Sequence, residues 1–418
     1  MKWIHTADWH IGRSLFGVNL IDDQAHLLEQ LIGILKDRKP DLLIVAGDIY
    51  DRSIPPEDAV ILLDRVFSQI LQETQVAILV ISGNHDSSAR LGFGSALLTS
   101  RGFHLVCNLK QSLSPIVIED ETGPVHFFAL PYSEPSLIRE FTGNQQVRDH
   151  DSAFEAMLPL FHNACPVSAR KILAAHAFVA GAATSDSERP LSIGGAGTVS
   201  TERFIGFNYV ALGHLHRAQN LGSEKVQYSG SLFNYSASEI DQEKSVTWVE
   251  MNASGEIHSA RIPLAPRRQL RKMKGELKDL LEQGQVALSA GDLKRHDYIL
   301  AELTDRGALF DPMGKLRLFY PNILHTDRAE QPRAPSGSVQ DSALAKNLRS
   351  SVKQSEFELF SSFFKEVTGE ETRAEEKAVF EEILSSWQKS QNDPTAHPLS
   401  GPDHKDPKRT NESNENIA

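Results

Sequence analysis

Residues 76–86 read VAILVISGNHD, an apolar run that stops at a group of polar and turn-forming residues. A short apolar run bounded by turn residues predicts a buried β-strand. Gly83 ends the strand, and Asn84, His85 and Asp86 follow at its carboxyl end. These three side chains can all bind metal ions, so the strand end is a candidate site.

Four other apolar runs end in the same way. They are residues 2–7, 42–46, 172–175 and 209–212, and the side chains that follow or end them are Asp8, His10, Asp48, His176, His214 and His216. In open α/β sheets ligands bind at the carboxyl ends of strands, so five such ends predict one shared site. A mixed set of carboxylates and imidazoles suits manganese, iron or zinc better than calcium or a thiolate-bound metal.

Two divalent metal ions about 3.5–4 Å apart can activate a water molecule and hold a phosphoryl group during in-line attack. Such a site needs a bridging carboxylate, and Asp48 is the natural bridge because it follows a central strand. Asn84 would add a neutral oxygen beside a phosphate. Each motif alone has a simpler explanation, since Asp-x-His can be a polar pair in a loop and Gly-Asp an ordinary turn. The five motifs together favour the metal site.

The composition is that of a globular protein, with 40% hydrophobic and 23% charged residues among 418. This length exceeds one ordinary hydrophobic core, so we expect two or three domains. No apolar stretch has transmembrane length and no signal peptide is evident, so we expect no membrane association. Cys107 and Cys165 are the only cysteines, which indicates the reducing cytoplasm. The net charge of −12 gives no general attraction to nucleic acid, although bound cations would reverse the local field.

The chain divides into five predicted segments: an α/β domain, a small α+β domain, a linker, a helical segment and a disordered polar tail, over residues 1–265, 266–328, 329–344, 345–389 and 390–418. The order of strands and helices in the first segment indicates two packed sheets with helices outside, not one parallel sheet. In the second segment we expect a helix over Leu270–Leu281 and strands over Tyr298–Leu303 and Lys315–Tyr320.

Two helical patterns near the C-terminus carry many apolar side chains. They span Ser355–Val367 and Glu375–Trp387, and the apolar side chains include Phe357, Phe360, Phe363, Phe364, Phe380, Ile383 and Trp387. So large an apolar surface must be covered by protein. The two helices could fold back on the first domain, or they could dock on another chain.

The order Asp-x-His, Gly-Asp, Gly-Asn-His-Asp, His and Gly-His-x-His resembles the calcineurin-like metallophosphoesterase superfamily. The residues around these motifs, together with Tyr228–Ser231 and Phe363–Glu371, are similar to the SbcD family of bacterial nuclease subunits. The resemblance implies an α/β sandwich of two packed mixed sheets flanked by helices, a small α+β capping domain and C-terminal helices. Leu232 stands where a proline is expected after Gly230-Ser231, which bears on substrate shape and not on the metals.

The resemblance also implies a ligand set for two divalent metal ions, with manganese expected and magnesium or iron as alternatives. The ligands would be Asp8, His10, Asp48 and His216 for one metal, and Asp48, Asn84, His176 and His214 for the other.

His85 would not be a ligand. It would stabilise the scissile phosphate and protonate the leaving oxygen, unless it is a turn histidine bonded to Asp86. Asp51 would not bind a metal but would orient one of the ligands, and Asp86 is placed in the same group of supporting residues. Arg52 would contact phosphate, although an ordinary surface arginine is an equally good interpretation.

The implied function is that of a DNA nuclease subunit in repair, replication and recombination. With an SbcC-type ATPase related to SMC proteins, two copies of each subunit would act as an ATP-dependent double-strand exonuclease and a single-strand or hairpin endonuclease. ATP would bind the partner, because this chain has no Gly-x-x-x-x-Gly-Lys-Ser/Thr motif. We expect a homodimer through the nuclease domain, and C-terminal helices that dock on the coiled coil of the ATPase.

Two rival functions stay open. The chain could act on a small nucleotide or a phosphomonoester, or it could be a non-catalytic scaffold, although every expected ligand position is filled. In the small domain, residues 267–274 carry five basic side chains in eight positions. This basic run could bind DNA phosphates, or it could be a solvated face.

Overall fold

The computed structural model describes residues 1–188, 197–329, 357, 360, 361, 364 and 372–391. Contacts divide the chain into two compact units, one formed by Met1–Thr304 with Asp311–Glu330 and the other by Asp305–Phe310 with Gln331–Ala418. Nearly all of the predicted linker and tail, and most of the helix predicted at Ser355–Val367, lie outside the described residues; residues 390 and 391 of the predicted tail are helical.

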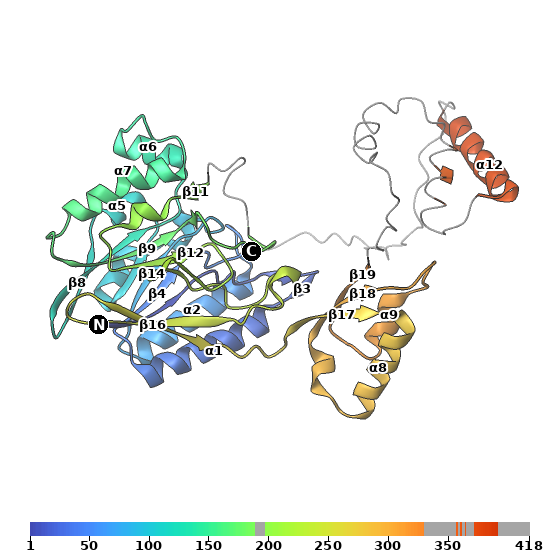
Figure 1. Ribbon diagram of the computed structural model, residues 1–418, viewed down its shortest axis with the longest axis horizontal. Helices are drawn as coiled ribbons and strands as arrows, with labels where there is room; N and C mark the ends of the chain where they lie inside the picture. The colour runs from blue at the N-terminus through green and yellow to red at the C-terminus, as the bar shows by residue number, and fades with distance from the viewer. Residues whose placement is uncertain (189–196, 330–356, 358–359, 362–363, 365–371, 392–418) are drawn as a thin grey trace, which may run out of the picture. The chain divides into compact units, whose positions relative to one another are not determined.

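The first unit is built around two six-stranded sheets (Figure 1). The first sheet has the order β16-β15-β1-β4-β5-β6, with strands Ile257–Pro263, Ser245–Met251, Lys2–Thr6, Leu42–Ala46, Ala77–Ile81 and Phe103–Val106. The second sheet has the order β13-β14-β12-β9-β8-β7, with strands Gln219–Leu221, Ser223–Tyr228, Tyr209–Gly213, Arg170–His176, Gly123–Leu130 and Ile116–Asp120. The predicted pair of sheets is confirmed.

Both sheets are mixed, and in both the central strands are parallel. β1, β4, β5 and β6 run parallel, whereas β15 pairs with β1 and β16 in antiparallel fashion. β14, β12, β9 and β8 run parallel, and β13 and β7 are antiparallel to their neighbours. The parallel strands therefore bring their carboxyl ends to one edge of each sheet.

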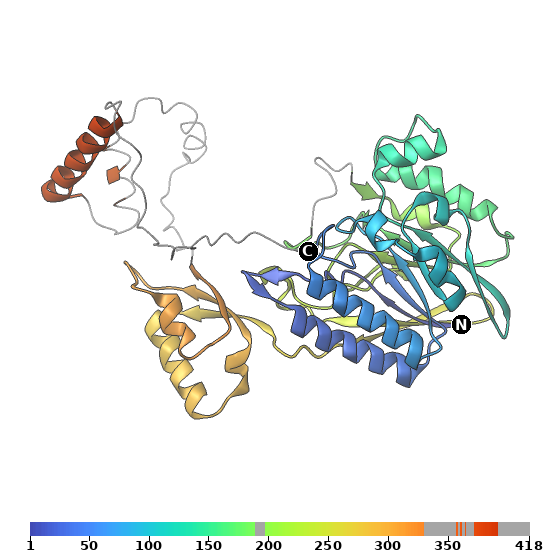
Figure 2. The same cartoon turned by 180° about the vertical axis from the view of Figure 1, so that it is seen from behind.

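Helices cover the outer faces of the two sheets on opposite sides (Figures 1 and 2). α1 (Ile21–Arg38) and α2 (Glu57–Glu73) pack on the first sheet, and α6 (Pro135–Thr142) and α7 (His150–Asn163) pack on the second. Between the sheets, the Trp3 ring makes T-shaped contacts with the rings of Phe127 and Tyr209, at centroid distances of 6.1 and 5.5 Å. Burial of these apolar faces holds four layers together.

Shorter elements connect these layers. They are β2 (Ser14–Leu15), β3 (Val18–Asn19), α3 (Ser88–Leu91), α4 (Ser95–Leu98), η1 (Thr99–Arg101), α5 (Leu109–Ser112), β10 (Phe178–Val179), β11 (Thr198–Val199), η2 (Thr201–Phe204) and η3 (Ala237–Glu239).

The small domain is a three-stranded parallel sheet, made of β17 (Leu270–Gly275), β18 (Tyr298–Leu303) and β19 (Ile323–Arg328). It also contains α8 (Leu277–Ser289), η4 (Leu293–His296) and α9 (Pro312–Arg317). The helix predicted over Leu270–Leu281 was wrong in its first half, because side chains alternate between more and less buried along β17. The strand predicted over Lys315–Tyr320 was also wrong: Pro312 opens α9, and the Asp311 carboxylate accepts from the Gly314 N–H.

In the second unit, α12 (Ala374–Gln391) confirms the last predicted helix. The rings of Phe360 and Phe380 stack with centroids 4.3 Å apart, and Phe357 lies 6.1 Å from Phe380. The side chains of Phe363 and Trp387 lie outside the described part of the chain. Among the described residues, no helix combines the length and the apolar character needed to cross a membrane.

Candidate metal centre

The seven predicted ligands all follow or end parallel strands. Asp8 and His10 follow β1, Asp48 follows β4 and Asn84 follows β5, all in the first sheet. From the second sheet, His176 ends β9, and His214 and His216 follow β12. Asn84 is partly exposed, and the other six ligands are at most 5% exposed. The two sheets therefore deliver buried polar groups to one place.

The structure brings these side chains within contact distance of one another. The measured separations are 3.0 Å for His10 Nε2–His216 Nε2, 2.9 Å for His176 Nε2–Asn84 Oδ1, 3.3 Å for His214 Nδ1–Asn84 Oδ1, 3.7 Å for His10 Nε2–Asp48 Oδ2 and 3.5 Å for His176 Nε2–Asp48 Oδ2. Asp48 thus lies close to histidines from both predicted ligand sets. This is the position that a shared carboxylate requires.

The backbone at this cluster is strained. Asp8, His10, Asp48 and His214 have φ values of 53°, 45°, 50° and 106°, in a region that residues other than glycine rarely occupy. Among the described residues only three other non-glycine residues share this feature. Such conformations cost about 1–3 kcal/mol each and concentrate at functional sites, where they hold side chains in fixed directions.

Two glycines make room for the ligands. A Cβ atom at Gly47 would collide with the His176 ring, and a Cβ atom at Gly83 would collide with the Asp48 carboxylate. Gly47 also has a φ of 93°. The glycines of the Gly-Asp and Gly-Asn-His-Asp motifs are therefore required for close approach of the chain segments, not only for the turns.

The electrostatics of the cluster fit divalent cations. Burial and the neighbouring Asp48 raise the pKa of Asp8 well above its usual range. Burial and neighbouring histidines lower the pKa values of His10 and His214, which keeps both imidazoles neutral with free lone pairs. The buried His10 Nδ1 has no hydrogen-bond partner among the described residues. Buried carboxylates and neutral imidazoles at these distances are a donor set that a pair of cations would stabilise.

Two triplets bring their ligand atoms closest together. They are Asp8–Asp48–His176 and His10–Asp51–His85, each with all three ligand atoms within 4.8 Å of one another. The first triplet differs from the division that the resemblance implies, because it joins Asp8 with His176. The second brings Asp51 and His85 beside a predicted ligand.

His85 is held by two hydrogen bonds. Its backbone N–H donates to Asp48 Oδ1 at 2.9 Å, and its ring Nδ1 lies 2.7 Å from the carbonyl oxygen of Asp51. A carbonyl only accepts, so Nδ1 carries a proton and Nε2 remains for chemistry. The ring centroid lies 4.8 Å from that of His10. His85 is therefore fixed against the cluster, and its ring bonds Asp51 where the turn interpretation expected Asp86.

The chain is similar to known proteins over most of its length. The calcineurin-like phosphoesterase model matches residues 1–218, which contain the whole cluster, and the type 5 capsule protein repressor C-terminal domain model matches residues 266–368. The SbcD chain of the SbcCD nuclease of Staphylococcus epidermidis is 33% identical over 324 residues, which are 78% of this chain and 84% of that protein. The chain belongs to the SbcD family.

Two solved structures are also similar to this SbcD family member. A dimetal phosphatase from Danio rerio is 13% identical with a TM-score of 0.36, and a protein from Thermus thermophilus is 12% identical with a TM-score of 0.35. Each match covers 62% of this chain and 98% of the solved chain.

The three predicted supporting residues have different surroundings. Asp51 pairs with Arg13 at 3.2 Å and lies 3.9 Å from His10 Nδ1. Arg52 is 63% exposed and lies 3.6 Å from Asp51. Asp86 accepts from the backbone N–H groups of three residues in the ligand loops, Ile49, Tyr50 and Gly83. Asp86 therefore ties two loops together, and its oxygens are occupied by backbone groups.

The sequence did not reveal the polar groups behind His216. Glu239 and Lys244 form a buried ion pair there, and Glu188 accepts from the His216 backbone N–H at 2.8 Å. Glu188 and Lys244 lie in loops and Glu239 ends the three-residue η3, so no periodic pattern in the sequence marks them. A glutamate and a lysine five positions apart are ordinary on a surface.

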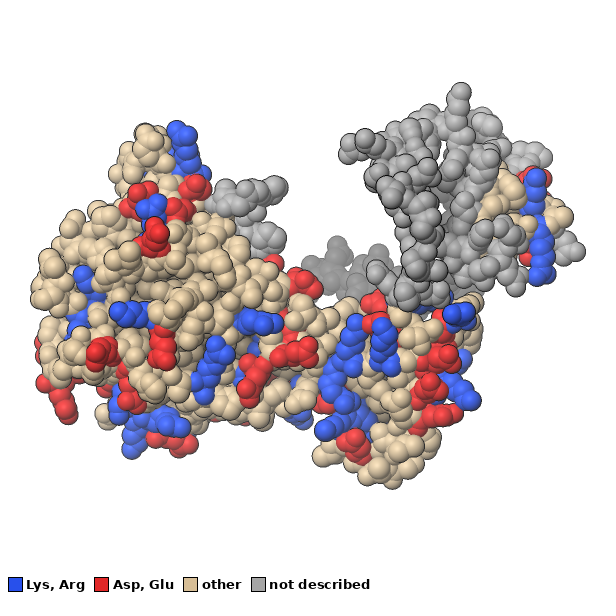
Figure 3. All heavy atoms as spheres, viewed as in Figure 1, with Lys and Arg blue, Asp and Glu red and all other residues tan. Residues whose placement is uncertain are grey.

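The basic run of this SbcD-type small domain is mostly neutralised. Four of its five basic side chains pair with carboxylates, as Arg268–Asp23, Arg271–Asp297, Lys272–Glu302 and Lys274–Glu302. Figure 3 likewise shows Lys and Arg beside Asp and Glu on this domain. These pairs weigh against an open strip of phosphate-binding residues.

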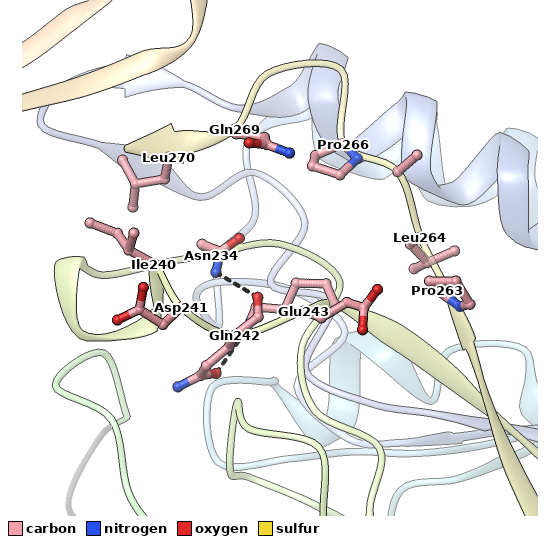
Figure 4. A pocket seen from close by; sticks show the side chains of 12 residues that line it. Asn234, Ile240, Asp241, Gln242, Glu243, Pro263, Leu264, Pro266, Gln269 and Leu270 are labelled. Carbon is pink, nitrogen blue, oxygen red and sulfur yellow. Dashed lines mark hydrogen bonds between the residues drawn. The ribbon is translucent and has the colours of Figure 1, made fainter. Parts of the chain in front are cut away.

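A cavity of about 540 Å³ lies next to the loop at 240–244 and the segment at 263–270 (Figure 4). None of the predicted site residues lines it, and Lys244 does. The cavity is therefore separate from the ligand cluster.

Proposed function

We propose that the chain is the metal-dependent nuclease subunit of an SbcCD-type complex and hydrolyses phosphodiester bonds in DNA. The observation that carries the proposal is the position of Asp48, within 3.7 Å of His10 and 3.5 Å of His176. One carboxylate can then serve two cations, which is the arrangement used for phosphoryl transfer. The relative named as a nuclease subunit supports a nucleic acid as the substrate, and we propose DNA.

The proposed ligands are Asp8, His10, Asp48 and His216 for one cation, and Asp48, Asn84, His176 and His214 for the other. When bound, the cations would supply an activated water molecule and neutralise charge on the phosphate. Manganese is the proposed metal, and magnesium and iron are the alternatives: carboxylate and amide oxygens suit manganese and magnesium, and imidazoles suit iron.

His85 is the proposed catalytic acid. Its Nδ1 proton is engaged by the Asp51 carbonyl, so Nε2 would hold the proton that passes to the leaving oxygen. The bond from the His85 N–H to Asp48 ties the position of this acid to that of the shared carboxylate. Asp51 would orient both His85 and His10.

The remaining segments have proposed roles outside the chemistry. Residues 1–265 would form the nuclease domain, and residues 266–328 would cap the site and contact DNA. Residues 345–389, behind a linker at 329–344, would bind an SbcC-type ATPase. The apolar groove of about 360 Å³ lined by Phe360, Phe364, Glu376, Val379, Phe380 and Ile383 suits a partner helix. Phe357, Phe363 and Trp387 belong to the same proposal.

We also propose a heterotetramer with two copies of each subunit, acting on DNA ends and hairpins in the cytoplasm. The nuclease domain would form the contact between the two SbcD-type chains. Exposed apolar side chains support an interface on this domain, since Ile61, Phe93 and Leu97 are 60%, 87% and 81% exposed.

The test is a manganese-dependent hydrolysis assay on hairpin DNA, blunt-ended DNA and a small phosphodiester, with and without the ATPase. Asp48→Ala should lose activity on every substrate and release at least one metal by elemental analysis. Asp37→Ala, which removes an exposed carboxylate at the end of α1, is the control and should behave as the natural chain. Full metal content and activity in Asp48→Ala would contradict the site, and cleavage of the small ester alone would contradict the substrate.

A further inference from the structure

A buried ion pair lies directly behind His216. Glu239 is 0% exposed and Lys244 is 5% exposed, and Lys244 Nζ lies 2.6 Å from Glu239 Oε2. Lys244 also donates to the Ser231 hydroxyl at 3.0 Å and to the Gln242 side-chain carbonyl at 3.2 Å. With the His216 carbonyl 2.9 Å away, four acceptors surround the three N–H donors of the ammonium group, so at least one hydrogen bond is shared and the ion pair is fixed in the protein interior.

The second oxygen of this carboxylate, Oε1, contacts the imidazole of His216. Glu239 Oε1 lies 3.1 Å from His216 Nδ1, and the Ser187 hydroxyl lies 2.7 Å from the same nitrogen and donates to Glu239. A carboxylate only accepts, so His216 Nδ1 carries its proton. The lone pair of His216 Nε2 is then free, and this atom lies 3.0 Å from His10 Nε2 in the ligand cluster.

The backbone of His216 is held by the same group of residues. Lys244 Nζ donates to the His216 carbonyl at 2.9 Å, and Glu188 accepts from the His216 N–H at 2.8 Å. The ring of His216 is therefore held by the buried Glu239, and its main chain by the buried Lys244 and the half-buried Glu188. The ring of His176 differs, because its Nδ1 bonds the backbone carbonyl of Ala46 at 2.9 Å.

Stability alone does not explain the ion pair. Taking two charges out of water costs several kcal/mol per ion, and well-packed apolar residues are often as stabilising as a buried pair. The geometry at His216 supplies another reason, since carboxylates that bond metal-ligating histidines fix the tautomer and the ring direction.

We propose that Glu239, held by Lys244, is a positioning residue that fixes the tautomer and direction of His216 for one of the two cations. This inference rests on the proposed two-metal site. Glu239 acts only through His216, so its loss should weaken the cation that His216 holds and spare the cation held by His176 and His214.

The test measures manganese binding to the full chain by equilibrium dialysis. In Glu239→Gln, the amide oxygen should turn to Lys244, which can only donate, and the amide NH₂ would face His216 Nδ1. This arrangement moves the imidazole proton to Nε2 and blocks the ligand atom. We expect the manganese affinity of one site to fall by about 10–100-fold and that of the second to stay unchanged. At manganese concentrations between the two dissociation constants, the number of bound manganese ions per chain should fall from two to one.

A second variant guards against misfolding. Glu239→Leu with Lys244→Met removes both charges together, which keeps the interior apolar and should preserve the fold. It should show the same selective loss, because the carboxylate at His216 Nδ1 is gone and only the Ser187 hydroxyl remains there. Asp120→Asn is the matched control: it breaks the Asp120–Arg170 ion pair, whose closest atoms are 2.7 Å apart, and should leave both manganese affinities unchanged.

The outcomes separate the two proposals. If the natural chain binds fewer than two manganese ions, the proposed function fails. If it binds two, and the Glu239 variants also bind two with unchanged affinity or lose both equally, only the positioning role is overturned. Selective loss of one ion in folded variants supports it.

Discussion

His85 owes its proposed role to two short bonds of a single side chain and its backbone. His85 is not one of the seven proposed ligands, and its bond to Asp48 comes from the backbone N–H. His85→Gln should therefore keep both metals and the affinity for DNA. The chemical step should slow by about 10²–10⁴-fold, the usual effect of losing a general acid. Single-turnover hydrolysis at saturating manganese measures it. An unchanged rate would make His85 a turn residue.

Gly83 shows how little space the ligand loops leave. A methyl group there meets the Asp48 carboxylate, so Gly83→Ala should displace the shared ligand and reduce metal content. Gly33→Ala is the matched control, since Gly33 lies within α1 and its Cβ would meet no atom within 4 Å. The control should gain about 0.5–1 kcal/mol of stability. Elemental analysis and urea unfolding of both variants distinguish local crowding from general damage.

The sequence predicted the strands of the first domain better than it predicted β17 and the residues that support His216. The five strand ends were predictable because short apolar runs bounded by glycine and polar residues favour strands, and five of them end in residues that bind metals. In the small domain, a helix was wrongly predicted where β17 lies. Leu270 is buried, but four of the next five residues are charged or glycine, so the apolar pattern of a strand is weak there. The supporting groups of His216 were not predictable, since the short η3 that carries Glu239 and the loop that carries Lys244 are placed by tertiary packing.

Asp120 at the end of β7 gives a prediction for acid stability. The hydrogen bonds from the Arg170 guanidinium hold the pKa of Asp120 well below its usual range. A carboxyl group with a lowered folded-state pKa stabilises the fold above its unfolded pKa of about 3.9, and this contribution is lost as the pH falls through the folded value. Asp120→Asn should therefore destabilise the protein at pH 7, and the deficit should shrink below about pH 4. The test is the free energy of unfolding in urea of both proteins at pH 7 and below about pH 4. An equal loss of stability in the variant at the two pH values would contradict this prediction.

At the scale of the whole molecule, chemistry and partner binding are assigned to different parts of the chain. All seven proposed ligands lie between residues 8 and 216, whereas the stacked Phe360 and Phe380 lie in the second unit. The sequence allowed two fates for the terminal helices, because an apolar helix face does not specify what covers it.

Truncation at about residue 340 decides between these fates. If the terminal helices bind the ATPase, the shortened chain should stay folded and cut simple DNA substrates with manganese. It should no longer bind the partner, and ATP should no longer stimulate cutting. Thermal unfolding and a pull-down with the ATPase measure both effects. Aggregation or a much lower Tm would mean that the helices belong to the core of this chain.

The wide spacing of the ligands has a consequence for biosynthesis. His214 and His216 emerge from the ribosome some two hundred residues after Asp8. At about 5–20 residues per second, translation of that interval takes about 10–40 s. During this time the nascent chain lacks part of the proposed centre, and any product released early lacks two of its histidines. If the proposed ligand set is right, hydrolysis of DNA would begin only after His216 has been added to the chain.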